Sequence, residues 1–153
     1  MKLRFVWVGK TKRGPFRELA EDYLARVGRF ARVEVVELRD RDDADARKII
    51  EKEGEDILSR TAGDPFVVVL DEKGSELSSH DFARFIEKHR LASTRQMTFV
   101  IGGHAGLSDE VKRRADFTLA LSRMTLTHDF ARAVLAEQVY RAFTIIHDLP
   151  YQK

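Results

Sequence analysis

The chain has 153 residues, of which 43% are hydrophobic and 34% charged, a composition typical of one globular domain with a substantial core. It contains no cysteine, which excludes a disulfide framework, a thiolate zinc site and a cysteine nucleophile. The net charge of +2 permits a nucleic-acid partner without requiring one. The opening residues, MKLRFVWVG, carry a charge at Arg4 and only a brief apolar run. We therefore expect no signal peptide, no membrane span and a cytoplasmic protein.

The first part of the chain alternates predicted strands and helices. β-Branched and aromatic residues predict strands at Leu3–Val8 and Val33–Leu38. Between these strands, Pro15 is suited to the first turn of a helix, where its missing N–H costs little. A charged connection at Arg39–Asp45 leads to a second predicted helix at Ala46–Ser59. Six apolar residues share one face of the first helix: Phe16, Leu19, Ala20, Tyr23, Leu24 and Val27.

The middle of the chain continues the same alternation. The run Pro65–Leu70, PFVVVL, is continuously apolar, which is typical of a strand buried on both faces of a parallel sheet. We expect a loop at Asp71–Ser78. Ser78 and Asp81 have the spacing of a capping box, with aspartate in place of the usual glutamate, and this predicts the start of a helix.

The stretch from Phe99 to Asp129 has the features of a ligand site. It reads as a strand (Phe99–Ile101), a turn with three glycines, a short helix, a strand (Phe117–Leu121) and a polar loop (Ser122–Asp129). In open α/β sheets, ligands bind beyond the carboxyl ends of such strands. The last predicted helix, Phe130–Ile146, carries an apolar stripe that suits either a core helix or a dimer interface. Together the elements predict one α/β domain with about five mostly parallel strands.

Several common site motifs are incomplete. GKT at residues 9–11 resembles the end of a phosphate-binding P-loop, but Arg4 stands where that pattern requires glycine. In GGHAG the first two glycines are adjacent, so the spacing of the dinucleotide fingerprint is missing. The five histidines show no metal-ligand spacing. We expect no metal, and the function must come from the loops as a set.

These loops carry a family resemblance. The segments FVIGGHAGLS (99–108), LALSRMTLTHDFAR (119–132), LAEQVYRAF (135–143) and the final PYQK resemble the SPOUT class of methyltransferases, and specifically the ribosomal RNA large subunit methyltransferase H family. The opening MKLRFVWVGK and the GEDILSR around Ile57 also fit, so the resemblance covers nearly the whole chain. Its most specific parts are the IGG-x-x-GLS turn and the LS-x-MTL-x-H loop, which occur in the family's order and at its distance.

The resemblance implies a SPOUT fold of five to six strands with a deep carboxyl-terminal trefoil knot, and an obligate homodimer. It also implies transfer of methyl from S-adenosylmethionine to N3 of a pseudouridine in 23S rRNA of the assembled ribosome. A sulfonium methyl is already activated, so the reaction needs alignment and removal of the N3 proton rather than a metal or nucleophile. The family's cofactor positions correspond to Leu70, Gly102, Leu121, Ser122, Arg123, Met124, Thr125 and Leu126.

The expected substrate contacts come from the last helix, the carboxyl terminus and a basic loop. We assign Tyr151, Gln152 and Arg141 to catalysis, because the family uses the tyrosine position in its active site and an aromatic ring can stack a splayed-out base. Salt-sensitive phosphate contacts are also expected from the basic loop formed by Lys10, Lys12 and Arg13. The other expected RNA contacts are Arg132, His128 and Lys153, although His128 could instead fix the loop and each arginine could belong to a solvated helix face.

The carboxyl terminus departs from the family, whose members usually end in Pro-Tyr-His followed by lysine or arginine. Here Gln152 stands at the histidine position, and glutamine keeps the hydrogen-bonding reach but cannot titrate. Two functional classes therefore stay open: an active methyltransferase, and a ribosome-associated binding protein of the same fold with lost or weak turnover. We expect an active enzyme, because the N3 proton is acidic enough to leave to water and the methyl donor is highly reactive.

Overall fold

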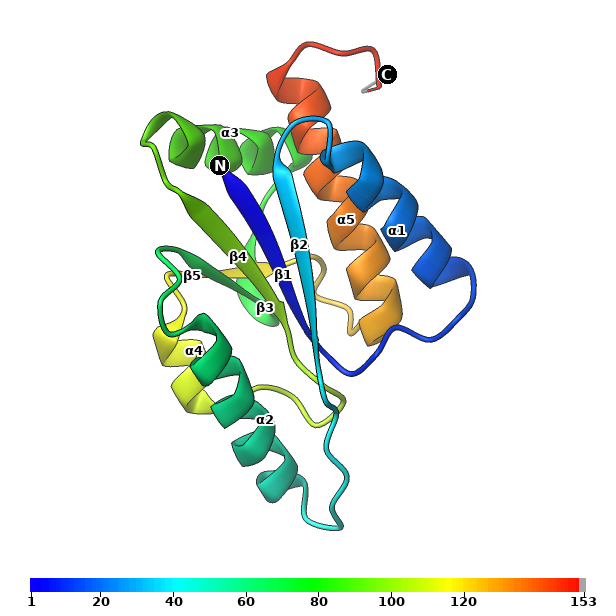
Figure 1. Cartoon of the computed structure of the whole chain (residues 1–153), viewed down its shortest axis with the longest axis vertical. Coiled ribbons are helices and arrows are strands. Elements are labelled where there is room, and N and C mark those ends of the chain that lie inside the picture. The colour runs from blue at the N-terminus through cyan, green and yellow to red at the C-terminus, as the bar shows by residue number, and fades with distance from the viewer. Residues whose placement is uncertain (152–153) are drawn as a thin grey trace.

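A central parallel sheet organises the chain in the computed structural model, which describes residues 1–151 (Figure 1). Within these residues the strands are β1 (Lys2–Val8), β2 (Arg32–Leu38), β3 (Val67–Glu76), β4 (Gln96–Ile101) and β5 (Phe117–Ala120). The sheet order is β2-β1-β4-β3-β5, and each neighbouring pair is parallel. The predicted α/β class with about five mostly parallel strands is confirmed, while the trefoil knot stays a prediction from the resemblance.

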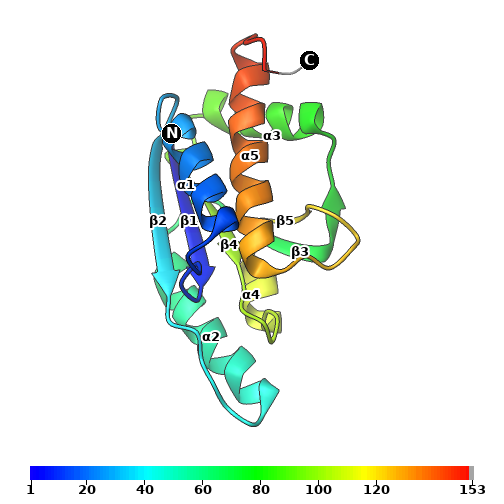
Figure 2. The ribbon, with the colours of Figure 1, turned by 90° about the vertical axis from the view of Figure 1, so that its right-hand side faces the viewer.

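Helices cover both faces of the sheet (Figures 1 and 2). They are α1 (Pro15–Val27), α2 (Ala46–Thr61), α3 (Ser79–Leu91), α4 (Asp109–Arg114) and α5 (His128–Ile146). Side chains alternate along β1, and the two faces build separate clusters. Phe5 and Trp7 pack with residues of α1, α3 and α5, whereas Val6 and Val8 pack with residues of α2 and α4. None of the helices in residues 1–151 is long and apolar enough to cross a membrane.

Local sequence signals explain where three of the helices begin. Pro15 starts α1 directly after Gly14, as its missing N–H predicts. The side chain of Asp45 accepts a hydrogen bond from the backbone N–H of Arg47 at the start of α2. Ser78 Oγ accepts one from Asp81 N at 3.1 Å and caps α3, so the predicted capping-box start is confirmed.

Strand β3 differs from the sequence prediction, which placed a loop at Asp71–Ser78. The strand continues to Glu76 with a register shift, because Leu70 and Ser75 both pair with Leu119 of β5. Residues 71–74 form the irregular segment between these two pairs. A β-carbon on Gly74 would lie 2.6 Å from the carbonyl oxygen of Thr118, so glycine permits a backbone approach that other residues would obstruct.

Helix α5 packs inside its own chain, between α1 and α3. Its central residues Val139 and Phe143 are fully buried, so the width of its apolar stripe is explained without a second subunit. The exposed large apolar side chains of this region are instead Phe16 and Leu19 of α1 and Phe130 of α5. The Phe16 and Phe130 rings lie 5.3 Å apart between centroids. These exposed side chains are therefore the candidates for a dimer interface in this region.

The sheet and α5 place two regions at opposite ends of the molecule. Loops after β1, β2 and β4 gather at the carboxyl edge of the sheet, where α5 also begins (Figures 1 and 2). Helix α5 then runs along the sheet, and the described carboxyl end lies at the far end of the molecule (Figure 1). This separation matters for the predicted site residues, because they come from both ends of α5.

Candidate active site

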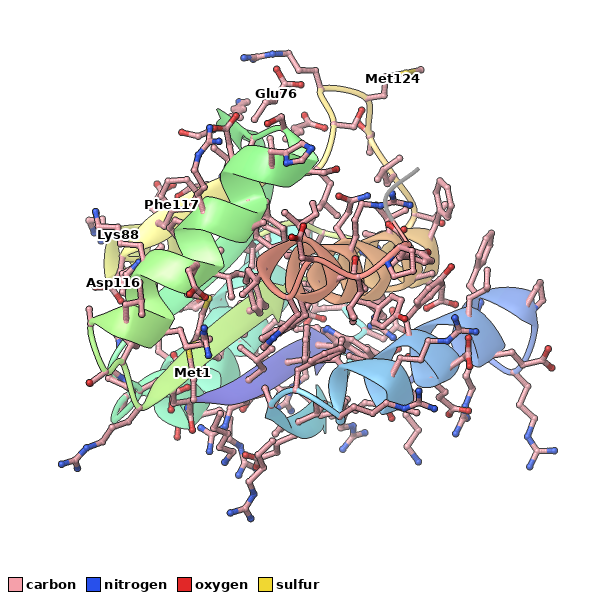
Figure 3. All side chains as sticks on the ribbon, turned by 90° about the horizontal axis from the view of Figure 1, so that it is seen from above. Met1, Glu76, Lys88, Asp116, Phe117 and Met124 are labelled. Atoms are coloured by element: carbon pink, nitrogen blue, oxygen red, sulfur yellow. The ribbon has the colours of Figure 1, made fainter. Side chains whose placement is uncertain are left out.

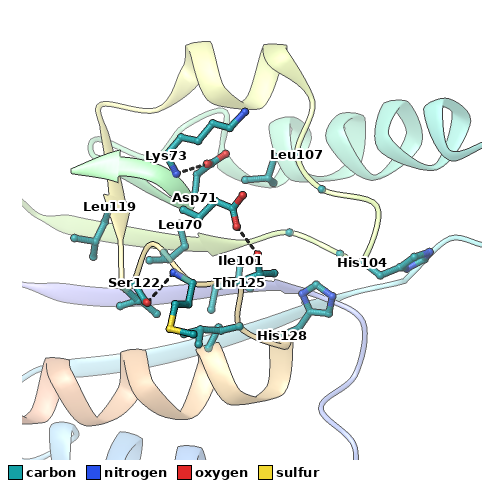
Figure 4. Close-up of a pocket in the computed structure, with 18 of the residues that line it drawn as sticks. Leu70, Asp71, Lys73, Ile101, His104, Leu107, Leu119, Ser122, Thr125 and His128 are labelled. Atoms are coloured by element: carbon teal, nitrogen blue, oxygen red, sulfur yellow. Dashed lines mark hydrogen bonds between the residues drawn. The ribbon is translucent and has the colours of Figure 1, made fainter. Parts of the chain in front are cut away.

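A cavity of about 370 Å³ opens at the carboxyl edge of the sheet (Figure 4). Such a volume is within the range of small-molecule sites in proteins. Three segments supply most of its lining: residues 70–73 in the middle of β3, the glycine turn after β4, and the loop between β5 and α5. Of the predicted cofactor residues, the structure brings Leu70, Gly102, Leu121, Ser122, Met124, Thr125 and Leu126 around this cavity.

The glycine turn forms one wall of the cavity. Gly103 and Gly106 form an isolated antiparallel bridge, and Gly106 has a φ of 97°, a conformation that favours glycine. A β-carbon on Gly102 would lie 2.6 Å from Cδ2 of Leu107, which also lines the cavity. Any larger residue at position 102 would therefore displace Leu107 or the turn itself.

A buried glutamate lies close to Gly103 of this turn. Glu53 of α2 is 1% exposed, and its Oε1 accepts a hydrogen bond from Arg41 N at 3.0 Å. Its Oε2 has no hydrogen-bond partner within residues 1–151, and a β-carbon on Gly103 would overlap it. Burial raises the pKa of Glu53, although the Arg41 N–H and the charge of His104 oppose the shift. Sequence reasoning missed this residue, because a glutamate inside a helix is usually exposed.

Hydrogen bonds hold the loop between β5 and α5 against β3. Ser122 Oγ accepts from Met124 N at 3.0 Å, and Thr125 Oγ1 donates to Glu72 Oε2 at 2.7 Å (Figure 4). Met124 is 77% exposed at the loop surface (Figure 3). The side chain of Arg123 is not among the groups lining the cavity, and it pairs with Glu76 at 2.9 Å. Its position therefore fits backbone contact or loop support rather than a side-chain contact to the cofactor.

Charged residues from two elements meet at another wall of the cavity. Asp71 accepts a hydrogen bond from Lys73 N at 2.8 Å and pairs with Lys112 of α4 at 3.0 Å (Figure 4). Burial by itself would raise the pKa of Asp71, but the Lys73 N–H and the Lys112 ammonium outweigh it and hold the pKa below its usual value. Asp71 is therefore a carboxylate at neutral pH. In the sequence, only the position of Asp71 directly after a buried apolar run indicates this group.

Two histidines lie at the α5 side of the cavity, His104 from the glycine turn and His128 from the first position of α5 (Figure 4). Burial, and then the charge of Arg132, lower the pKa of His128. The ring is therefore neutral at physiological pH and offers one donor and one acceptor nitrogen. Within residues 1–151, no group of three or more histidine, aspartate or glutamate side chains is arranged to hold a metal ion.

Arg132, a predicted RNA contact, lies in the interior. It is 1% exposed and donates to the carbonyl oxygens of Val8 and Gly9 at 2.6 and 3.1 Å. It also donates to Thr11 Oγ1 at 2.8 Å. Because only 1% of Arg132 is exposed, its guanidinium presents no surface to a phosphate, and the predicted direct RNA contact does not fit this structure. The position of Arg132 near the start of a helix could not show that its partners are carbonyl groups more than 120 residues away in the sequence.

The remaining predicted catalytic residues gather at the other end of α5. Tyr151 donates to Glu137 Oε1 at 3.0 Å, and its oxygen lies 3.1 Å from Tyr23 Oη. Arg141 donates to the same glutamate at 2.7 Å and stacks over the Tyr151 ring, with 4.8 Å between guanidinium carbon and ring centroid. Burial, and then the bonds to Tyr23 and Glu137, raise the pKa of Tyr151, so the phenol stays protonated. Two further predicted residues, Gln152 and Lys153, lie outside the described residues.

Comparisons with known proteins identify the family of this chain. The family model described as "Predicted SPOUT methyltransferase" matches residues 1–152. The curated "Ribosomal RNA large subunit methyltransferase H" of Syntrophotalea carbinolica is 45% identical over 153 residues, covering 99% of this chain and 98% of that protein. The protein of the same name from Carboxydothermus hydrogenoformans is 44% identical over 159 residues, covering 100% of both chains.

Solved structures show the same fold at low identity. A probable methylase family protein from Haemophilus influenzae aligns with a TM-score of 0.60 and 13% identity, over 99% of this chain and 70% of that one. A probable methyltransferase from Bordetella pertussis aligns with a TM-score of 0.56 and 10% identity, over 92% of this chain and 95% of that one. The family model and the full-length sequence matches show that this chain belongs to the SPOUT methyltransferase family, in the group of ribosomal RNA large subunit methyltransferase H proteins.

Proposed function

We propose that this protein transfers a methyl group from S-adenosylmethionine to N3 of a pseudouridine in 23S rRNA of the assembled ribosome, and that it acts in the cytoplasm as a homodimer. The observation that carries the proposal is the cavity at the carboxyl edge of the sheet. Residues of the IGG-x-x-GLS turn and the LS-x-MTL-x-H loop line it together. The full-length identity to relatives named as rRNA large subunit methyltransferases supports the same substrate class.

The cavity suits S-adenosylmethionine, the methyl donor of this family. Leu70, Leu119, Leu121 and Leu126 give it apolar walls, and the glycine turn exposes backbone to it. The Asp71 carboxylate and the Lys112 ammonium, paired at 3.0 Å on the cavity wall, offer both charges to a ligand that carries an ammonium, a carboxylate and a sulfonium. When bound, the cofactor supplies an activated methyl on a sulfonium. The task of the protein is then to align that methyl with the base and to exclude water.

The predicted catalytic groups lie too far from this cavity to act on it within one chain. His128 lines the cavity, and Arg141 follows thirteen positions later on the same helix, which corresponds to about 20 Å along the axis. We propose that the active site is composite. The cavity of one subunit would then face the Tyr151 and Arg141 end of its partner, an arrangement that an antiparallel twofold contact along α5 would produce.

In this composite site the carboxyl-terminal cluster orients the target base. Tyr151 is a neutral hydrogen-bond donor rather than a base, because its phenol stays protonated beside Glu137. Arg141 fixes the Tyr151 ring from one face, which leaves the ring positioned to stack on a splayed-out base. The proposal assigns removal of the N3 proton to water, with Gln152 as a hydrogen-bonding group that orients the base.

The test is transfer of radiolabelled methyl from S-adenosylmethionine to ribosomes from a strain that lacks this modification. The expected result is incorporation into 23S rRNA at one pseudouridine, with no incorporation into ribosomes that already carry the methyl group. If the folded protein binds the cofactor and the ribosome but transfers no methyl group, the proposed methyltransferase activity is refuted. That outcome would instead support the binding protein with lost turnover, which remains as the alternative because of Gln152.

A further inference from the structure

The loop that follows β1 presents three cations to solvent. In residues 9–14, here called the basic loop, Lys10, Lys12 and Arg13 are exposed. None of the three makes an ion pair within residues 1–151. Many other arginines of the chain differ, because they pair with a carboxylate three or four positions away on their own helix, as Arg17 does with Glu21. The basic loop therefore keeps its positive charge available for an external anion.

The inner side of this loop is held by a buried arginine. Arg132 of α5 bonds to Val8 O, Gly9 O and Thr11 Oγ1 at 2.6, 3.1 and 2.8 Å. Its guanidinium also lies over the Trp7 ring at 5.2 Å. Removing a guanidinium from water is costly unless hydrogen bonds compensate for it, and here most of the compensating oxygens belong to the basic loop and the strand end before it. The buried charge thus fixes the shape of a surface loop.

Two nearby acidic groups bond on the inner side of the loop, whereas Asp40 is exposed beside Gly9. Glu37 of β2 accepts from Thr11 N at 3.0 Å and from Thr11 Oγ1 at 3.1 Å. Asp129 lies 3.4 Å from Arg132 and is turned toward it. Thr11 is buried between these partners, with Lys10 before it and Lys12 after it both exposed. Thr11 therefore ties the loop inward, while Lys10, Lys12 and Arg13 stay exposed. These three cations outnumber the two exposed carboxylates beside the loop, Glu37 and Asp40.

The basic loop lies beside the cofactor cavity. Trp7 of β1 pairs with Ile101 of β4, so the basic loop and the glycine turn leave neighbouring strands at the same edge, roughly 5 Å apart where they start. Arg132 stands one helical turn after His128, which lines the cavity. Figure 2 shows the loop between β1 and α1 beside the start of α5. A ligand that reaches into the cavity from this side passes the basic loop.

We propose that the basic loop is a docking surface for the phosphate backbone of the RNA substrate, and that Arg132 acts from inside to hold it in shape. This inference rests on the proposed function, because it concerns the same substrate. RNA is the partner that the chemistry favours, since unpaired lysines and arginines on a fixed loop neutralise phosphates and release counterions. The contact orients the RNA and carries no sequence information of its own.

The experiment compares two triple variants that remove the same charge. The first is Lys10→Gln, Lys12→Gln and Arg13→Gln. The matched control is Arg29→Gln, Arg32→Gln and Arg95→Gln, three exposed cations near the amino-terminal edge of the sheet. Binding to 50S subunits is measured over a range of salt concentrations, together with methyl transfer, S-adenosylmethionine affinity and mass by light scattering.

The proposal predicts that the first triple variant binds 50S subunits at least about tenfold more weakly and that its salt dependence falls by a slope of about two to three, as expected for three lost phosphate contacts. Cofactor affinity and mass should stay unchanged, and the control variant should behave like the parent. Equal effects of the two triple variants on ribosome binding would overturn the proposal. Absence of methyl transfer by the parent protein would contradict the proposed methyltransferase activity but not the docking surface. Ribosome binding tests the docking surface separately.

Discussion

Gly102 shapes the proposed cofactor cavity through the space that it leaves to Leu107. Because a β-carbon at position 102 would lie 2.6 Å from Leu107 Cδ2, we predict that Gly102→Val weakens S-adenosylmethionine binding at least tenfold, or about 1.4 kcal/mol. Adding Leu107→Ala should recover part of the loss, since it returns the space. Calorimetry measures both affinities, with Gly63→Ala as the control because a β-carbon there has no atom within 4 Å. Unchanged affinity in a folded Gly102→Val protein would contradict the steric role.

The raised pKa of Glu53 predicts how the stability of the protein depends on pH. Burial raises the pKa of its carboxyl in the folded chain, so the folded state holds the proton more tightly than the unfolded state does. The free energy of unfolding therefore falls as pH rises from the unfolded pKa through the folded one. Glutamine does not titrate. We predict that Glu53→Gln gains stability relative to the parent as pH rises from about 4 to about 8, because only the parent pays the cost of a buried charge.

Denaturant unfolding of both proteins at several pH values checks this prediction about Glu53. A stability difference that is constant over the range, or that shifts against glutamine at high pH, would mean that the folded-state pKa is not raised. Asp71 is a useful contrast, because its pKa is lowered in the folded state. Its contribution to stability is present above the unfolded pKa and is lost as pH falls through the folded pKa, so the two carboxyls affect stability in opposite directions.

Among the elements, β3 depends most on tertiary context. Its apolar first part, residues 67–70, follows from composition, whereas its continuation to Glu76 depends on pairing with β5 more than forty residues later. Periodicity cannot report such a partner, and the charged residues 71–73 read as a loop. The helix starts at Pro15 and Ser78 were predictable because proline and a capping hydroxyl act within one turn.

The packing of Gly74 on β5 yields a prediction for that element. A β-carbon on Gly74 would lie 2.6 Å from Thr118 O and 2.9 Å from Leu119 C, and backbone atoms cannot move aside as a flexible side chain can. Gly74→Ala should therefore shift β3 away from β5, lower the melting temperature and weaken cofactor binding, because the preceding residues line the cavity. Thermal unfolding and calorimetry measure these effects. A variant with the parent's melting temperature and affinity would show that the close approach is dispensable.

For the molecule as a whole, the fold class and most of the cavity were accessible from the sequence, but for different reasons. Alternating strand and helix patterns predict the parallel sheet. The cofactor positions Leu70, Gly102 and 121–126 came from the family motifs, and all but the Arg123 side chain meet around one cavity. The burial of Glu53 and Arg132 was not predictable, because their backbone partners belong to other segments: Arg41 N–H bonds one Glu53 oxygen, and Val8 O accepts from Arg132. Burial of a charge is a property of the assembled fold.

The proposed homodimer should use the exposed apolar residues of α1 and α5. Phe16 and Phe130 are about two-fifths exposed, and a patch of this kind on a small protein usually has a partner. We predict that the parent protein has a dimer mass by light scattering and that Phe16→Asp with Phe130→Asp converts it to monomer. The control is Leu91→Asp at the end of α3, since Leu91 is 73% exposed. A dimer that survives the double substitution would assign the interface to another face.

The composite active site can be tested by mixing two impaired proteins. The assay uses an S-adenosylmethionine concentration that saturates the parent protein but not the Gly102→Val variant. Under this condition Gly102→Val should impair the cavity and Tyr151→Ala the carboxyl-terminal cluster, so each homodimer should show little methyl transfer to ribosomes. A heterodimer of the two would hold one intact composite site, formed by the cavity of one subunit and the Tyr151 end of the other. Random exchange of subunits should then restore about a quarter of the parent's activity. Mixtures that exchange subunits yet gain no activity would show that the cavity and Tyr151 do not act across the dimer.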